Sequence, residues 1–380
     1  MMKYFRCKQT KLVLSLTAII ITLFSCSNSK DFLYSTVACG RYHTVAIKTD
    51  GTLWAWGYNK YGQLGLGDNR DRNLPAQVGV ATDWAMIACG NYHTIAIKKN
   101  GTLWASGLNM DYQLGFGNNT DRNSFMQMGT DADWSRVACG ARHTIAIKTD
   151  GTLWAWGSNS QFQFGLGDNM NRKLPVQIGA NKDWSKVTCG EMYTIAIKTD
   201  GTLWAWGNNE QGQLGLGDSL DCVNLPTQVG TSTDWTIIAC GNVHTAAIKT
   251  DGTLWVWGYN SQYQLGLGDD MNRKLPVQIG TSKDWSKVDC GAFHTVAVKI
   301  DGTLWAWGMN NYGQLGVKNV FLASLRAALG SYDFKFHRPI IVEGKVNCSQ
   351  IICGTFHTVV INTDGTLWIC GNNEYGQLGR

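Results

Sequence analysis

The sequence of 380 residues predicts an all-β protein, a seven-bladed β-propeller built of four-stranded blades. Three observations lead to this prediction. One phrase, "CGRYHTVAIKTDGTLWAWG" at Cys39–Gly57, returns in seven near-copies along the chain. Each copy holds two short runs rich in β-branched and aromatic residues, separated by a turn signal. These runs are apolar on both sides, as expected for small sheets that are covered on both faces.

The period of the repeat indicates the architecture. The units begin at Gly51, Gly101, Gly151, Gly201, Gly252, Gly302 and Gly365. The first five spacings are 50, 50, 50, 51 and 50 residues, and the sixth is 63. A period near 50 residues is typical of propellers and arrays, in which one small unit buries its faces against its neighbours.

Each unit supplies four strand candidates. Thr44–Lys48 and Thr52–Trp56 flank Asp50-Gly51, which suits a type I′ hairpin turn with positive φ at both central positions. Leu74–Gly79 and Asp83–Gly90 supply the other two strands. The proline in the first of these predicts an outer edge strand, where a missing N–H does no harm.

The two ends of the chain bear on closure of the ring. There are seven hairpins but only six segments similar to "LPAQVG", because the sequence given stops at "GQLGR", residues 376–380. We therefore expect residues 33–50 to pair with residues 365–380, completing the last blade and closing the ring. One blade would then lack a strand.

The first 32 residues are expected to lie outside the propeller, which spans 33–380. Lys3, Arg6, Lys8 and Lys11 precede an apolar run of 13 residues at 12–24, which is too short to span a bilayer and predicts a signal peptide over residues 1–25.

"LFSC" resembles the lipobox of bacterial lipoproteins, which implies cleavage before Cys26, a lipid on its sulfur and a linker over 26–32. The protein would then be exported to the cell envelope and held on a membrane, the outer one in a Gram-negative cell. An ordinary secretory signal is the alternative.

The charge balance argues against a nucleic-acid partner. The chain has 33 basic and 28 acidic residues, and four basic residues lie in the signal, so 29 − 28 leaves +1. A nearly neutral body has no electrostatic footprint for phosphate backbones.

The repeat resembles a known family. "GQLGLGD" at Gly62–Asp68, together with the phrase before it, is similar to the repeat of the regulator of chromosome condensation family, and the resemblance covers residues 33–380. It implies the seven-bladed fold. It also implies two uses: protein binding, as in secreted bacterial members that cap an enzyme, and guanine-nucleotide exchange on a small GTPase.

The repeated histidines suggest a metal at first sight. They are His43, His93, His143, His244, His294 and His357, with Tyr193 at the seventh place. However, Cys39 and His43 are about 13 Å apart along an extended strand, too far to share one ion. We interpret the histidines as bonded to backbone groups within each blade, and we expect no metal and no cofactor.

The cysteines are also interpreted as structural. Seven of the 12 occupy the repeat position and are expected to be small buried apolar residues, because equivalent positions approach within disulfide distance only near the axis. Cys348 and Cys370 stand where other repeats carry Trp, as at Trp84 and Trp56. Either drift or a Cys348–Cys370 bridge would account for them.

No catalytic set is present in the sequence, which has no G-x-S-x-G elbow, phosphate loop or C-x-x-C pair, so we expect a non-enzyme. The 17 tryptophans occupy strand positions of the repeat. None follows the glycine before the "HT" pair, where the plant ultraviolet-B photoreceptor of this family has its sensing tryptophans, so photoreception is rejected.

Function is expected at the positions that vary between repeats. The two residues after "CG" and the residue after the hairpin both lie at the end opposite the Asp-Gly turn, so they should share one face. Aromatic side chains are favoured anchors of protein interfaces. The candidate partner-binding residues are Arg41, Tyr42, Tyr58, Asn91, Tyr92, Arg142, Glu191, Met192, Tyr259, Phe293 and Phe356.

The sequence therefore predicts a non-catalytic binding propeller with a protein partner. Nucleotide exchange on a small GTPase is the alternative, and glycan binding at the aromatic loops is a weaker one. A unique insertion at about 317–338 contains "FLASLRAALG", which predicts a short helix.

Overall fold

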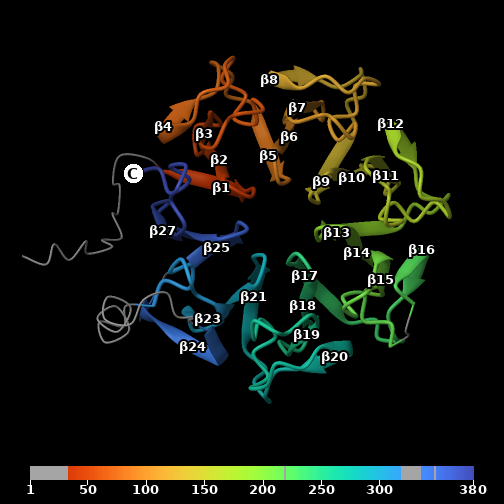
Figure 1. The fold of residues 1–380 in the computed structure, drawn as a ribbon, viewed down its shortest axis with the longest axis vertical. Helices are drawn as coiled ribbons and strands as arrows, with labels where there is room; N and C mark the ends of the chain where they lie inside the picture. The colour runs from red at the N-terminus through yellow and green to blue at the C-terminus, as the bar shows by residue number, and fades with distance from the viewer. Residues whose placement is uncertain (1–32, 218–219, 318–334, 346–347) are drawn as a thin grey trace, which may run out of the picture.

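The computed structural model describes residues 33–217, 220–317, 335–345 and 348–380. In these ranges the chain forms seven antiparallel sheets that follow one another around a central axis (Figure 1). None of the residues in these ranges is helical, so none belongs to a helix that could cross a membrane. The seven-bladed propeller predicted from the repeat is confirmed.

The strands have the following bounds. The first sheet holds β1 (Tyr34–Cys39), β2 (His43–Lys48), β3 (Leu53–Gly57) and β4 (Arg72–Gln77), and the second β5 (Trp84–Cys89), β6 (His93–Lys98), β7 (Leu103–Gly107) and β8 (Arg122–Gln127). The third holds β9 (Trp134–Cys139), β10 (His143–Lys148), β11 (Leu153–Gly157) and β12 (Arg172–Gln177), and the fourth β13 (Trp184–Cys189), β14 (Tyr193–Lys198), β15 (Leu203–Asn208) and β16 (Cys222–Gln228). The fifth holds β17 (Trp235–Cys240), β18 (His244–Lys249), β19 (Leu254–Gly258) and β20 (Arg273–Gln278), and the sixth β21 (Trp285–Cys290), β22 (His294–Lys299), β23 (Thr303–Met309) and β24 (Lys335–Lys345). The seventh holds β25 (Cys348–Cys353), β26 (His357–Asn362) and β27 (Leu367–Gly371).

Each blade runs from the axis outward in chain order. Strands such as β1 and β5 lie nearest the axis, and strands such as β4 and β8 form the rim (Figure 1). The proline-containing fourth strand is therefore the outer edge strand, as predicted.

The repeated hairpin is confirmed, but its turn is not type I′. Gly51 has φ of +82° and Asp50 does not have a positive φ. Gly51 N–H donates to the Lys48 carbonyl at 2.9 Å, which gives a three-residue loop with glycine in the left-handed position. The Asp50 carboxylate accepts from both Thr52 N–H (2.9 Å) and the Thr52 hydroxyl (2.6 Å), so the aspartate is retained for turn chemistry rather than catalysis.

The core lies between blades rather than inside one. Between the first two blades, Val45, Leu53 and Ala55 pack against Trp84 and Ile87 of the next sheet. Each interface buries about ten apolar side chains in this way, which explains why the hairpin strands carry apolar residues on both faces.

The repeated histidine joins neighbouring blades, which corrects our expectation of backbone bonds within one blade. His43 Nε2 lies 3.0 Å from the hydroxyl of Thr94, and that hydroxyl donates to the Gln63 carbonyl at 2.8 Å. The same histidine–threonine contact recurs at His93–Thr144, His244–Thr295, His294–Thr358 and His357–Thr44. Because the threonine proton goes to the carbonyl, histidine must donate from Nε2. Burial, the main cause, lowers the pKa of His43 to about 3, so the ring is neutral.

Ring closure also differs from the prediction. Residues 33–50 do not complete the last blade: β1 and β2 belong to the first sheet, and the last sheet has three strands. The physical reason is that a short turn joins each innermost strand to the hairpin that follows it, so β1 pairs with β2. The ends instead meet as two stacked blades, with Tyr34 N–H donating to the Gly365 carbonyl at 2.8 Å and Trp56 Nε1–H to the Gln377 carbonyl at 2.9 Å. The blade that lacks a strand is confirmed.

The final blade has repacked around two of its three cysteines, Cys348 and Cys370. None of the described cysteines forms a disulfide, so there is no Cys348–Cys370 bridge. Gly266 and Gly316 are equivalent positions in consecutive repeats. The ring nearest to Gly266 is that of Trp307, at the repeat position that Cys370 occupies in the final blade. At Gly316, a Cβ would instead lie 1.9 Å from a ring carbon of Trp368. Trp368 therefore fills the space that the missing tryptophan leaves.

The predicted helix in the 317–338 insertion lies outside the described residues. The last four residues of that insertion, 335–338, belong to the long edge strand β24.

Candidate partner-binding face

The variable residues of each blade are brought together by one backbone hydrogen bond. Tyr58 N–H donates to the Tyr42 carbonyl at 2.9 Å, and Leu108 N–H donates to the Tyr92 carbonyl at 2.8 Å. Equivalent bonds occur in the other five blades. We call the end of the propeller that carries these turns and the loops after the third strands the variable face. The repeat thus fixes the backbone of this face and leaves its side chains free to differ.

Aromatic side chains form a continuous group on one sector of the variable face. The aromatic cluster consists of Tyr42, Tyr58, Tyr61, Tyr92, Tyr312, Phe356 and Tyr375, from the first, second, sixth and seventh blades. The Tyr42 ring lies 5.0 Å from Tyr375, 6.3 Å from Tyr58 and 6.3 Å from Phe356, between centroids. These tilted and edge-on contacts hold the rings against one another. The cluster is therefore a preformed surface of low conformational freedom.

Three members of the cluster were not predicted from the sequence. Tyr61, Tyr312 and Tyr375 stand three residues after the variable position that follows the hairpin, and each precedes glycine. The other four blades have different residues at this position. A Tyr-Gly pair that occurs in only three repeats was therefore the sequence feature that could have identified these three residues.

Burial and neighbouring rings change the acidity of the cluster. Burial, together with the neighbouring Tyr61 and Tyr92, raises the pKa of Tyr58 to about 12. The Arg41 guanidinium lies 5.3 Å from the centroid of the Tyr42 ring, which gives the cluster a cation–π contact at its edge. The Tyr58 hydroxyl therefore stays protonated at neutral pH and can both donate and accept hydrogen bonds.

The remaining sector of the variable face carries flexible apolar side chains. Met110, Met170, Met192, Leu220 and Met271 are 54%, 61%, 39%, 60% and 66% exposed. Unbranched thioethers adapt to irregular surfaces. Tyr259 and Phe293 form a separate pair in this sector, 6.2 Å apart.

Two charged candidates are held by partners. Arg142 Nη1 lies 3.1 Å from Asp111 Oδ2. Burial raises the pKa of Glu191, and the nearby guanidiniums of Arg41 and Arg142 oppose this shift.

The opposite face is nearly uniform. In five blades a lysine at the end of the second strand pairs with an aspartate that precedes the first strand, as in Lys98–Asp83 at 3.0 Å. The same lysines lie over strand tryptophans, as Lys98 lies 4.7 Å from Trp104. Uniform contacts of this kind serve the common fold, whereas the side chains on the variable face differ from blade to blade.

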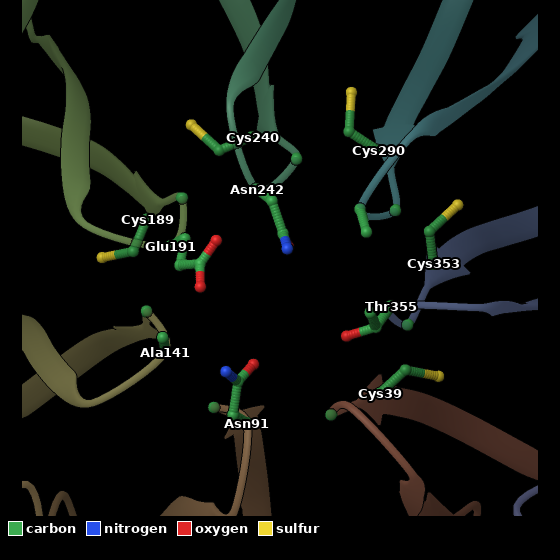
Figure 2. A pocket seen from close by; sticks show the side chains of 18 of the residues that line it. Cys39, Asn91, Ala141, Cys189, Glu191, Cys240, Asn242, Cys290, Cys353 and Thr355 are labelled. Carbon is green, nitrogen blue, oxygen red and sulfur yellow. The ribbon is translucent and has the colours of Figure 1, made fainter. Parts of the chain in front are cut away.

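A cavity of about 140 Å³ lies on the axis at the variable-face end (Figure 2). The cysteine sulfurs labelled there point away from the axis, into the spaces between blades. Burial raises the pKa of these thiols, for instance that of Cys89 to about 12. By solvent exposure only Cys290 of the repeat cysteines is buried and the other six are half-buried, so the prediction that all seven are buried was wrong for the six that lie beside the axial cavity.

No set of three or more histidine, cysteine, aspartate or glutamate side chains among the described residues is placed to hold a metal ion.

Comparison with known proteins defines the class of protein first. Six stretches, residues 50–97, 100–147, 150–197, 200–248, 251–298 and 301–361, match the family model of the regulator of chromosome condensation (RCC1) repeat, and a second model of the same repeat matches 34–63, 134–163, 184–213, 235–264, 285–314 and 348–377. The fold and the repeat together define a propeller of this repeat class. The chain belongs to the regulator of chromosome condensation repeat family.

Similar solved structures cover most of the chain. Human WBSCR16 is 25% identical over 88% of both chains, with a TM-score of 0.75. Yeast RCC1 (Prp20), in its structure bound to Kap60, is 20% identical over 90% of this chain and 82% of that one, also with a TM-score of 0.75. The second of these likenesses shows the fold alone.

Curated relatives match only short stretches. Protein RCC2 homolog of Xenopus laevis is 46% identical over 50 residues, which is 13% of this chain and 10% of that protein. Ultraviolet-B receptor UVR8 of Arabidopsis thaliana is 43% identical over 42 residues, 11% of this chain and 10% of the receptor. The matched stretch is thus about a tenth of each relative's length.

Proposed function

We propose that this protein is a non-catalytic protein-binding propeller that docks its partner on the variable face. The observation that carries the proposal is the continuous aromatic cluster on a backbone that the repeat holds fixed. Tyrosine and tryptophan side chains anchor protein interfaces because they bury a large area at a low cost in conformational entropy. The aromatic contacts of the opposite face, such as Trp84–Trp104, repeat from blade to blade and so distinguish no single docking sector.

We also propose that the protein is exported and carries a lipid on Cys26, which would present the propeller at a membrane surface. The support is the sequence of residues 1–26, which lies outside the described ranges. Metabolic labelling with a tagged fatty acid tests this: wild type should be labelled and Cys26→Ala unlabelled. Equal labelling of both would contradict the lipid anchor.

Capture from the native membrane fraction tests the binding face. The test variant is the double substitution Tyr42→Arg with Tyr58→Ser. It introduces the residues that the third repeat has at these positions, Arg142 and Ser158. The matched control is Lys99→Thr on the opposite face, since the equivalent residue of the preceding repeat is Thr49. We expect the double variant to lose the captured protein and Lys99→Thr to keep it, with both variants folded by circular dichroism. Equal capture by all three proteins would contradict the proposal.

A second candidate function is guanine-nucleotide exchange on a small GTPase, which the family implies. Prp20p of Saccharomyces cerevisiae binds Gsp1p and histones, and its chain is 21% identical to this one, with a TM-score of 0.71. Exchange needs binding energy and no catalytic residues on the propeller. Accelerated release of fluorescent guanine nucleotide from a GTPase panel would favour exchange over simple capture, and release at the uncatalysed rate from every GTPase would exclude it for that panel.

A further inference from the structure

The axial cavity lies at the centre of the variable face. Its wall is formed by the Cys-Gly backbone of all seven blades and by residues that follow the glycines. The side chains of Asn91, Glu191, Asn242 and Thr355 point into it from four different blades (Figure 2). Its volume of about 140 Å³ accommodates roughly four or five water molecules, or one side chain of a partner.

The charged side chains that line the cavity are both acidic, while the guanidiniums of Arg41 and Arg142 act on Glu191 from outside the lining. Two carboxyl groups line the cavity, Glu191 near the face and Asp289 at the end of β21, and none of the described lining residues is lysine, arginine or histidine. Asp289 also lines a second cavity, of about 310 Å³, that shares several of the same cysteines. The carboxyl group of Asp289 therefore lies beside the axis and also bonds across to the innermost strand of the next blade, at Cys353.

Asp289 has no basic partner among the described residues. Its Oδ2 accepts the Cys353 N–H at 2.6 Å, and no cation contributes to its titration. Burial raises its pKa to about 7. Four other blades carry alanine at this position: Ala38, Ala88, Ala138 and Ala239. The fold therefore does not need a carboxyl group there, and a buried carboxylate without a cation is costly.

The arrangement of acceptors suits an ammonium group. Oxygen atoms of Glu191, Asn91 and Thr355 face the axis from different blades, whereas Asn242 turns its amide nitrogen toward it (Figure 2). Oxygens that approach from separate directions match the three donors of an ammonium better than the planar fork of a guanidinium. Tyr92 and Phe356 directly follow the lining residues Asn91 and Thr355 in the chain and belong to the aromatic cluster. Aromatic surface beside a cavity suits the methylene stem of a lysine.

We propose that the axial cavity binds the primary ammonium group of a lysine side chain, which the protein partner inserts along the propeller axis. This inference rests on the proposed function, because it names the group of the partner that the centre of the variable face receives. Glu191 and Asp289 are the charged acceptors, and Asn91 and Thr355 offer the neutral ones.

n-Butylammonium chloride is the probe, because it reproduces the end of a lysine side chain. Calorimetric titration should detect saturable binding to the full chain. n-Butanol should not bind, and sodium chloride at equal ionic strength should not displace the amine. Asp289→Ala and Glu191→Ala introduce the residue that other repeats have at the same position. Each should weaken binding of n-butylammonium by at least about tenfold. Glu210→Gln, an exposed change on the same face outside the cavity, should leave it unchanged. Displacement by sodium, or unchanged affinity in Asp289→Ala and Glu191→Ala, would overturn the proposal.

Capture separates this proposal from the proposed function. If Asp289→Ala and Glu191→Ala both keep the captured partner while Tyr42→Arg with Tyr58→Ser loses it, lysine insertion is wrong and the binding face stands. If Tyr42→Arg with Tyr58→Ser keeps the partner, the binding face itself is wrong. Loss of capture in the cavity variants, reversed in wild type by excess n-butylammonium but not by sodium, is the expected result.

Discussion

The contact between histidine and threonine across the blade interfaces can be tested with a matched pair of substitutions. Thr295→Val removes a hydroxyl that accepts from His244 Nε2 at 3.0 Å and donates to the Gln264 carbonyl at 2.8 Å. Thr194→Val is the control, because its hydroxyl donates to the Gln163 carbonyl at 2.8 Å and the ring nitrogens of the adjacent histidine have no partner among the described residues.

The expected difference follows from what each substitution leaves unpaired. In both variants the glutamine carbonyl keeps a second donor, a tryptophan Nε1–H at 2.9 Å. Only Thr295→Val leaves a buried histidine N–H without an acceptor, which costs about 1–3 kcal/mol. We therefore expect the free energy of unfolding of Thr295→Val to fall below that of Thr194→Val by this amount.

Denaturant unfolding followed by tryptophan fluorescence measures the difference. The slope of the transition should be the same in both variants, since neither changes the surface exposed on unfolding. Equal midpoints for the two variants would refute the assignment of the histidine as a donor to the neighbouring blade.

The other predictions concern titration, packing and thiols. Asp289 has a pKa near 7 when folded and near 4 when unfolded, so it stabilises the fold below pH 4 and that stabilisation is lost as the pH rises to 7. Relative to wild type, Asp289→Ala should gain up to about 4 kcal/mol in free energy of unfolding between pH 4 and 7, measured by denaturation at each pH. Gly316→Ala should destabilise more than Gly313→Ala, by about 2 kcal/mol or more in thermal or denaturant unfolding, because both glycines have positive φ but only Gly316 has a ring, that of Trp368, within 4 Å. Mass mapping without reduction should find no disulfide between Cys348 and Cys370.

Each of these predictions has a contrary result. A difference between wild type and Asp289→Ala that does not change with pH would show that this carboxyl titrates normally. Equal destabilisation of the two glycine variants would show that Trp368 does not occupy the vacated space. A bridged peptide containing both cysteines would contradict the packing of the final blade.

The fold was largely predictable because its signals are local and repeated. The Asp-Gly turn and the apolar runs recur seven times, and local hydrogen bonds such as that from Thr52 to Asp50 act within one unit. The turn type was wrong because Gly51 alone has positive φ. The prediction of ring closure was wrong because the sequence repeat was taken to begin at the Asp-Gly turn. Each sheet instead begins at its innermost strand, so β1 belongs to the first blade and not to the last.

The binding face was predictable only in part. That Tyr42 and Tyr58 lie together follows from hairpin topology, and their centroids are 6.3 Å apart. That Tyr375 joins them, 5.0 Å from Tyr42, depends on contact between residues from opposite ends of the chain. The role of His43 was missed for the same reason, since its partner lies 51 residues away in the next blade. Features that span two blades cannot be derived from the pattern within one.

Photocrosslinking from the two faces of the propeller locates the docked partner. A photoreactive phenylalanine analogue replaces Tyr92 on the variable face in one protein and Lys99 on the opposite face in another, and both are irradiated in the native membrane fraction. We predict one dominant protein adduct from position 92 and none from position 99. The same adduct from position 99, with none from position 92, would show that the partner docks on the uniform face and that the aromatic cluster does not bind it.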